Sequence, residues 1–345
     1  MRHLHLPLLL FCAVVAGWAQ QSAEPGDVPP ATSERQITGH IESGFRWLPG
    51  QAGSSDVYRS VVNLGEGPRV TGAELHFSDP GNRFLDQGRF TASAWGGDPY
   101  NTASLDAAKA GLYDFRLNYR NVAYFNSLPS FANPLLSRGL FFSQRALDME
   151  RRQLDTELRF VPDSWISPYV SYNYASGSGR GITTFVTDGN EFPVSGIYDD
   201  GLHATRGGAR MQFSKASVIL VQGWTSYTDE SRLQFNDGGH QGNRPNRLLG
   251  QELILNQYSQ PYRATGEGLY QRGILNASPW SFLTFSGQFL YSQPRLRIRQ
   301  DAMAAGNFLR LETLLPFSNF AETVNSEAQM PHTSASTAVE FRPVS

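Results

Sequence analysis

The sequence predicts an all-β protein, an antiparallel transmembrane β-barrel. Three observations carry this prediction: an N-terminal export signal, a series of short segments in which apolar and polar residues alternate, and short turns that recur at one end of these segments. Alternation with a period of two gives a β-strand one apolar and one polar face. In a barrel that crosses an outer membrane, the apolar face meets lipid and the polar face lines the interior.

The first residues have the features of a secretory signal peptide. Arg2 supplies a positive charge, Leu6 to Ala16 form an apolar run, and Gly17-Trp18-Ala19 is a small-x-small cleavage site. The run is too short to cross a bilayer as a helix. We therefore expect residues 1–19 to be a signal peptide. Residues 20–35 are polar and rich in proline, which predicts a periplasmic linker.

The composition excludes several classes of function. Cys12 is the only cysteine and lies in the predicted signal peptide, so the mature chain has no disulfide, thiolate metal site or C-x-x-C-H haem attachment. The formal net charge of −2 gives no argument for nucleic-acid binding. No mature segment approaches about eighteen consecutive apolar residues, so membrane-spanning helices are not expected.

The clearest predicted strand is Gly111 to Asn121. Its aromatic and leucine side chains fall on one face, and its charged and amide side chains fall on the other. The first face carries Tyr113, Phe115, Leu117 and Tyr119, and the second carries Asp114, Arg116, Asn118 and Arg120.

Similar patterns predict about twelve strands in residues 36–345, which we assign to the barrel. A polar connection is expected between Gly96-Gly97-Asp98-Pro99 and Gly111, and Gly-rich or Pro-rich loops elsewhere. The predicted strands are residues 37–47, 57–64, 69–77, 84–95, 111–121, 154–160, 168–174, 206–213, 218–227, 262–275, 283–291 and 337–341.

Turn lengths alternate in the second half of the chain. Short turns are predicted at residues 162–164, 214–216 and 276–279, with loops of roughly twenty-five to forty residues between them. Short turns at one rim and long loops at the other are typical of outer-membrane barrels, in which the short rim is periplasmic. This arrangement predicts an outer-membrane location with the mature N-terminus in the periplasm.

The last residues, TAVEFRPVS, correspond only to the first half of a hairpin and lack a terminal aromatic residue. We therefore expect a barrel that is truncated at its C-terminus. The alternative is a barrel closed by pairing of residues 337–341 with residues 37–47, since an open strand edge in lipid leaves backbone groups unsatisfied.

Spaced aromatic and glycine positions between Tyr58 and Pro129 carry a family resemblance. Tyr58-Arg59 and Leu64-Gly65-Glu66-Gly67 are followed by Trp95-Gly96-Gly97-Asp98-Pro99, by Gly111-Leu112-Tyr113 and by Asn118-Tyr119-Arg120. This pattern resembles the N-terminal part of MtrB/PioB-type outer-membrane barrels, the porins of porin–cytochrome electron conduits. The resemblance implies a barrel that sheathes a multihaem c-type cytochrome, with haem on that partner and no cofactor on this chain. This chain is far shorter than the family's barrels.

Ten charged residues are predicted to line the interior. An Arg or Lys that faces lipid at mid-bilayer costs roughly 2–4 kcal/mol, so such side chains should point inward. They could set ion selectivity or dock a haem protein. Alternatively, both signs of charge pair across strands and fill the interior with a hydrated network. The ten are Asp114, Arg116, Arg120, Asp155, Glu157, Arg159, Arg206, Arg210, Arg263 and Glu267.

A second charged segment is Arg295, Arg297 and Arg299, which alternate with Leu296 and Ile298. The apolar phase changes after Pro294, so we expect this segment to extend above the membrane. There it would contact an anionic partner, lipid headgroups or solvent.

No catalytic or metal-binding pattern is present. The mature histidines have no metal-ligand spacing, and no G-x-S-x-G or similar motif occurs. Asp188-Gly189-Asn190-Glu191 lacks the acidic spacing of a calcium loop and predicts a turn. We therefore expect no enzyme and no metal site. Two functions follow: a sheath for a multihaem cytochrome in electron transfer, or a passive diffusion porin for small polar solutes.

Overall fold

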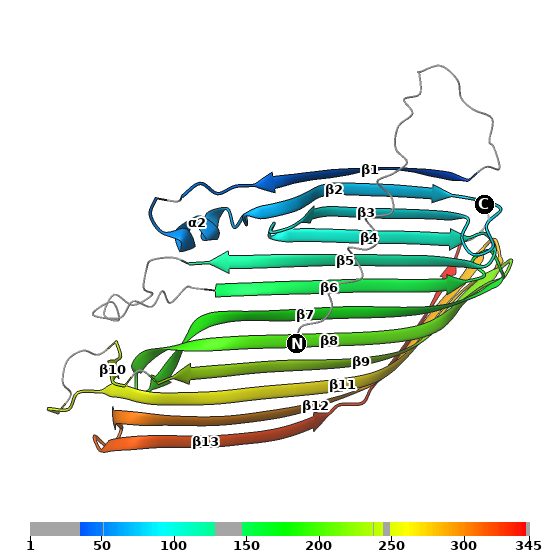
Figure 1. The fold of residues 1–345 in the computed structure, drawn as a ribbon. Coiled ribbons are helices and arrows are strands. Elements are labelled where there is room, and N and C mark those ends of the chain that lie inside the picture. The colour runs from blue at the N-terminus through cyan, green and yellow to red at the C-terminus, as the bar shows by residue number, and fades with distance from the viewer. Residues whose placement is uncertain (1–34, 51, 128–146, 237, 244–248, 343–345) are drawn as a thin grey trace. The chain divides into compact units, whose positions relative to one another are not determined.

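The computed structural model describes residues 35–50, 52–127, 147–236, 238–243 and 249–342. These residues form one antiparallel sheet (Figure 1), which confirms the predicted all-β class. The predicted signal peptide and nearly all of the linker lie outside the described residues. The strands are β1 (Gln36–Arg46), β2 (Gly67–Ser78), β3 (Gln87–Trp95), β4 (Tyr100–Lys109), β5 (Tyr113–Asn126), β6 (Leu147–Phe160), β7 (Ile166–Thr187), β8 (Asn190–Gln212), β9 (Ala216–Phe235), β10 (His240–Gln241), β11 (Ile254–Trp280), β12 (Leu283–Leu309), β13 (Pro316–Gln329) and β14 (His332–Phe341).

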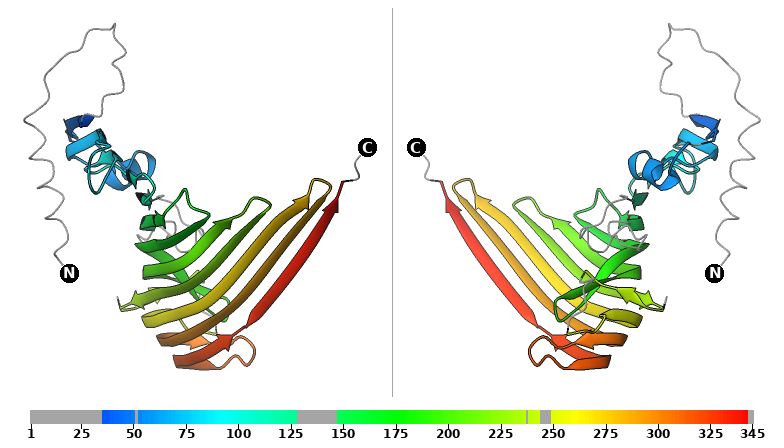
Figure 2. Two further views of the ribbon diagram at one scale, coloured as in Figure 1. Left: turned by 90° about the vertical axis from the view of Figure 1, so that its right-hand side faces the viewer. Right: turned by 90° about the vertical axis from the view of Figure 1, so that its left-hand side faces the viewer.

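Neighbours in the chain are neighbours in the sheet, in the order β1 to β9, then β11, β12 and β13. The strand β13 pairs with the second half of β12, and β14 pairs with its first half. Met330 N donates to Pro294 O over 3.1 Å between them, so β13 and β14 are two parts of one edge strand (Figure 2). The path therefore has twelve strand positions, which equals the predicted number because the missed strand β4 offsets the wrongly predicted strand 57–64.

The described residues show no pairing between the two edges of the sheet. Thr337 to Phe341 pair with Gly287 to Leu283 of β12 rather than with β1. The predicted alternative, closure of this segment against residues 37–47, is therefore not observed.

Residues 57–64 are not a strand, and this prediction is wrong. Ser55–Val61 form the helix α2, capped by Ser54, whose hydroxyl accepts from Val57 N at 3.4 Å. The Arg59 guanidinium lies 3.9 Å from the centroid of the Phe125 ring at the end of β5. A serine cap and an acidic first turn at Asp56 stabilise a helix locally. These signals outweigh the alternation that suggested a strand.

Two predicted irregular segments are also strands. The expected polar connection contains β4, whose apolar face is built from alanines on either side of Leu105, so its alternation is weak in the sequence. The expected Gly-rich loop after residue 174 is the hairpin of β7 and β8, which turns at Asp188-Gly189. The first residues of this expected loop, 175–181, are polar or small on both faces, which hides the two-residue period at its start.

At one rim all the connections are short, as predicted. They comprise residues 79–86, 110–112, 161–165, 213–215 and 281–282. The turn expected at 276–279 is wrong, because β11 continues to Trp280. At the other rim, long connections at 47–66, 127–146 and 236–253 alternate with short ones, and most of 127–146 lies outside the described residues.

One face of the sheet, which carries Leu117 and which we name the apolar face, is apolar from strand to strand. Antiparallel partners place their side chains on the same face, so the pairing assigns each residue. Large apolar side chains remain exposed on it, including Ile37, Leu220 and Phe289. One row consists of Leu75, Phe90, Leu105, Leu117, Thr156, Tyr172, Thr205, Trp224 and Leu269.

The opposite face, which carries Asn118, is the polar face. Most of its side chains are charged, amide, hydroxyl or very small from β1 to β8, whereas Ile219, Val221, Ile274 and Leu290 form an aliphatic patch on this face of β9, β11 and β12. The adjacent row consists of His40, Glu74, Thr91, Ser104, Asn118, Asp155, Asn173, Ala204, Thr225 and Gly268.

The polarity of the two faces is exchanged at the far end of β7 to β13. The tip of the β7–β8 hairpin, beyond Ser195, no longer pairs with β9 and packs on the polar face. The Phe185 ring lies 4.5 Å from that of Tyr258 and 6.3 Å from that of Phe308, between centroids. The resulting aromatic cluster consists of Phe185, Phe192, Val194, Phe235, Leu255, Tyr258, Ala304 and Phe308.

The turn between β3 and β4 requires glycine. Gly96 has a φ of +102° and Gly97 a φ of +98°. Gly65 N donates to Gly97 O over 2.7 Å, which brings the preceding connection against this turn. A Cβ atom on Gly96 would overlap the carbonyl oxygen of Pro68.

We therefore expect Gly96→Ala to lower the free energy of unfolding by about 2 kcal/mol or more, through left-handed strain and steric overlap. Gly44→Ala is the matched control, since its Cβ would meet nothing within 4 Å. Denaturant unfolding followed by circular dichroism measures both. Equal stability of the two variants would contradict this account of the turn.

Candidate functional site

Eight of the ten charged residues predicted to line an interior share the polar face. They come from three strands, β5, β6 and β8, and the pairing places opposite charges side by side. Asp114 is opposite Arg159, and Arg116 is opposite Glu157. The eight are Asp114, Arg116, Arg120, Asp155, Glu157, Arg159, Arg206 and Arg210.

One row of this face alternates in charge, and we name it the charge ladder. It consists of Arg89, Asp106, Arg116, Glu157, Ser171 and Arg206, one residue from each strand from β3 to β8. Arg206 Nε donates to Ser171 Oγ over 2.6 Å, and Arg116 Nε lies 3.8 Å from Asp106 Oδ1. Cross-strand neighbours of opposite sign attract each other, and the three arginines of the ladder alternate with two acidic residues and Ser171.

The ladder is solvated rather than buried. The Arg116 side chain is 67% exposed and that of Asp106 is 57% exposed. Exposed ion pairs of this kind contribute little to stability, about 0–1 kcal/mol each. Between the charges, side chains such as Ser104, Ala204 and Gly208 are small. The polar face can therefore accommodate water, solutes or a protein surface close to its backbone.

Arg263 and Glu267 do not belong to this group. The pairing of β11 with β9 and β12 places both on the apolar face, at the end where its polarity is exchanged. Arg263 Nε lies 3.2 Å from Glu230 Oε1, and Arg295 Nη1 lies 3.7 Å from Glu267 Oε1. The cost of a charge in lipid predicts an inward position for both, but they lie beyond the apolar part of their strand, where that cost does not apply.

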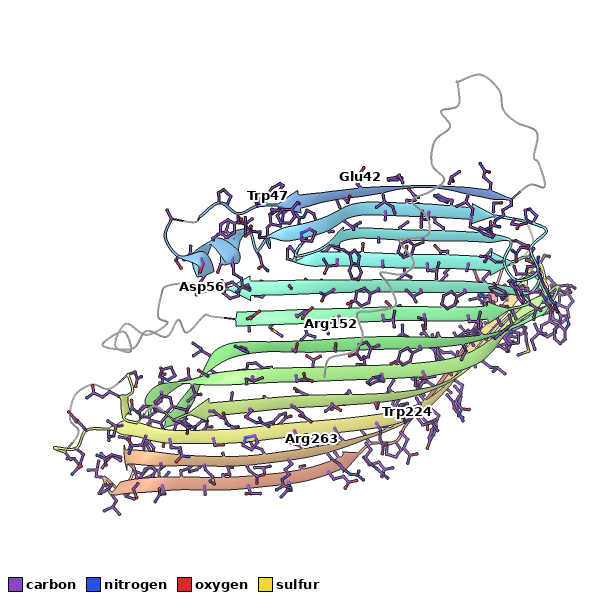
Figure 3. All side chains as sticks on the ribbon, viewed as in Figure 1. Glu42, Trp47, Asp56, Arg152, Trp224 and Arg263 are labelled. Atoms are coloured by element: carbon purple, nitrogen blue, oxygen red, sulfur yellow. The ribbon has the colours of Figure 1, made fainter. Side chains whose placement is uncertain are left out.

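Arg295, Arg297 and Arg299 lie on the same face as Arg263. The β11–β12 register is unbroken at Gly268 opposite Pro294, so the change of apolar phase is a change in the chemistry of one face. Figure 3 shows Arg263 displaced from Trp224 toward the β12–β13 turn. Acidic residues of neighbouring positions share this face with the arginines, and we name the whole group the charged field. It consists of Glu230, Arg263, Glu267, Arg295, Arg297, Arg299, Asp301 and Glu327.

Asp301 is held ionised within the charged field. Thr323 Oγ1 donates to its carboxylate over 3.0 Å and Arg299 Nε donates over 3.1 Å. The hydroxyl donor, followed by the guanidinium, lowers the pKa of Asp301 below its usual value.

Two of the motifs that carry the family resemblance, Leu64-Gly65-Glu66-Gly67 and Trp95-Gly96-Gly97-Asp98-Pro99, meet at the rim opposite the short turns, whereas Gly111-Leu112-Tyr113 lies at the short-turn rim. Asp98 accepts from Arg46 Nη1 over 2.8 Å and also forms an ion pair with Arg69. The side chain of Arg69 is 7% exposed and that of Asp98 is 14% exposed. Trp95 Nε1 donates to Thr102 O over 2.7 Å. These residues join β1, β2 and β4, so their role in the structure is to fix the rim.

No group of three His, Cys, Asp or Glu side chains suited to a metal comes together in the part of the chain that the structure describes. The one helix found there, α2, is neither long nor apolar enough to cross a bilayer.

Sequence analysis missed the aromatic cluster on the polar face. Phe185 and Phe192 fell in an expected loop, although they flank Asp188-Gly189, a strong hairpin signal. Their burial follows from the return of the hairpin tip onto β11 and β12. Asp188 Oδ1 accepts from Leu311 N over 3.2 Å and holds the tip there.

Comparison with known proteins gives one structural likeness. No protein-family model and no curated protein sequence matches the chain. The ferric yersiniabactin uptake receptor FyuA from Yersinia pestis matches with a TM-score of 0.42 and 9% sequence identity, over 77% of this chain and 42% of the receptor chain. The chain thus spans about two fifths of the length of that receptor, and a likeness of this size gives no information about function.

Loss of the Asp98 carboxylate should destabilise the rim. We expect Asp98→Ala to cost about 3 kcal/mol in unfolding free energy, because it leaves the Arg69 charge buried without this partner. The exposed ladder residue Asp106 is the control, and Asp106→Ala should cost less than about 1 kcal/mol. Both are measured by denaturant unfolding.

The double variant Arg69→Met with Asp98→Ala isolates the pair. It should recover much of the lost stability, since no unpaired charge remains buried. Additive losses in the double variant would contradict this explanation.

Proposed function

We propose that the sheet is the wall of an outer-membrane β-barrel, with the apolar face against lipid and the polar face around a hydrated interior. The observation that carries this proposal is the register that keeps exposed apolar side chains on one face from β1 to β12, with shifts only between Glu42 and Ser43 and near the ends of β11 and β12 in the described ladders. In water, an exposed apolar surface of this extent is unfavourable and marks contact with a membrane or a partner.

The dimensions of the apolar surface support this proposal. On β12, the segment from Leu283 to Tyr291 is apolar on this face, and its length of about nine residues matches that of a tilted membrane-spanning strand. We name the surface at this height the apolar belt. Aromatic pairs at the short-turn rim, Trp165 with Phe213 and Trp280 with Phe282, have centroids 5.7 and 6.0 Å apart. Aromatic girdles of this kind border the apolar band of outer-membrane barrels.

Within this barrel we assign the chain a sheath role for a multihaem c-type cytochrome in electron transfer across the outer membrane. The resemblance of residues 58–129 to the MtrB/PioB type supports this role. The charge ladder and the small residues between its charges supply a surface that a protein could approach closely. Haem would belong to the cytochrome, and the short-turn rim and mature N-terminus would face the periplasm.

The exposed, mixed charges of the polar face also favour a second function, a passive diffusion porin for small polar solutes. Such a porin needs a hydrated interior and no partner. The sheath requires a bound cytochrome, whereas the porin functions without a partner.

Gentle solubilisation of the barrel from cells that express periplasmic cytochromes separates the two functions. A sheath should co-purify with haem absorbance, and charge reversal of the ladder by Arg116→Glu and Arg206→Glu should reduce it. A colourless preparation that passes small sugars across liposomes by itself would instead establish the porin.

Membrane assembly tests the assignment of the faces. Phe115→Arg should impair folding into liposomes by roughly 2–4 kcal/mol, because the arginine would face lipid. Asn118→Arg, three residues along the same strand, should fold nearly as the wild type does. Quantitative refolding into vesicles measures both variants, and equal effects at the two positions would argue against a barrel wall.

A further inference from the structure

The charged field follows the apolar belt directly along the same strands and on the same face. On β12, Tyr291 of the belt is followed on this face by Gln293 and Arg295. On β11, Leu269 is followed toward the same rim by Glu267. The field is therefore continuous with the proposed lipid-facing surface.

The exchange of polarity fixes the level of the membrane surface. Where the charged field begins on one face of β12, Leu296 and Ile298 lie on the other, and the aromatic cluster follows farther along the strands, from Tyr258 and Ala304. Lipid would not favour the charged field, so the bilayer core must end between Tyr291 and Arg295. Arg295 lies two residues, or roughly 7 Å along the strand, beyond Gln293. This distance places it in the polar headgroup layer.

The rim identifies the leaflet. The charged field lies toward the β12–β13 turn, at the rim opposite the short turns. If the short turns are periplasmic, the headgroups at this level are those of the outer leaflet.

The arginines have the chemistry to bind phosphate. Arg295, Arg297 and Arg299 occupy alternate positions of β12, and their side chains are 39%, 58% and 72% exposed. Arg295 and Arg297 lie 3.5–3.7 Å from carboxylate oxygens of Glu267 and Glu327, beyond normal hydrogen-bond length. Their guanidinium groups can therefore donate to a phosphate, whose geometry matches the planar fork of arginine.

We propose that the charged field is a docking surface for the phosphate groups of outer-leaflet lipid headgroups, with Arg295, Arg297 and Arg299 as the binding residues. This inference rests on the proposed barrel, because it requires the apolar face to meet lipid. The acidic neighbours balance the arginine charges when no headgroup is bound.

Binding of diphosphorylated lipid A to the purified full chain in zwitterionic detergent tests the proposal. Native mass spectrometry should detect bound lipid A, and R295Q/R297Q/R299Q should weaken the affinity about ten-fold or more. The control R116Q/R206Q/R210Q removes as many arginines from the polar face and should bind as the wild type does. Binding should also weaken as salt is added.

Three results would overturn the proposal: unchanged affinity of R295Q/R297Q/R299Q, equal binding of lipid A from which the phosphates have been removed, or full displacement by inorganic phosphate at the lipid concentration. The last would indicate a free-phosphate site. Refolding into vesicles distinguishes this failure from failure of the barrel, since it tests insertion of the same proteins without reference to lipid A.

Discussion

The antiparallel register is the constraint on which the structure depends. A slip of one residue would move every side chain of a strand to the opposite face. The described ladders shift between Glu42 and Ser43 and close to the ends of β11 and β12, and elsewhere they run without a break. Apolar rows and charged rows thus remain separate across the sheet. Pairing sets the faces, so each strand contributes its own side chains to the two faces and also fixes the face on which its neighbours' side chains lie.

The apolar side of the sheet changes along the length of β12. In the first half of β12, apolar side chains cover one face and polar side chains the other, and in the second half this relation is reversed. The reversal requires no bulge at Pro294, because only the residue types change. The strands β11 and β12 each contain 27 residues, more than a membrane crossing needs. The additional residues of β11 and β12 contribute to the buried aromatic cluster, which the tip of the β7–β8 hairpin covers.

Charges have different roles at different places in the sheet. Asp98 and Arg69 are nearly buried and hold the rim, so their interaction is structural. The charge ladder is exposed, so its ion pairs add little to stability and it instead gives the polar face its charged surface. The charged field combines both signs in a surface that continues the apolar belt. These differences follow from solvent access, which determines whether an ion pair is screened by water.

The sequence by itself determined the all-β class, eleven of the twelve strand positions, the short-turn rim and the face of eight charged residues. These features follow from local alternation wherever the two faces differ strongly in polarity, as in β5 and β6. Only the tertiary structure decided that 57–64 contains a helix, that β4 and the β7–β8 hairpin are strands, and that Arg263 and Glu267 lie opposite the other eight. The alternation is weak in β4 and in residues 175–181, where most side chains are small or polar, and a local cap competes with it at 57–64. Pairing with distant neighbours, which no local pattern records, then fixes the conformation and the face.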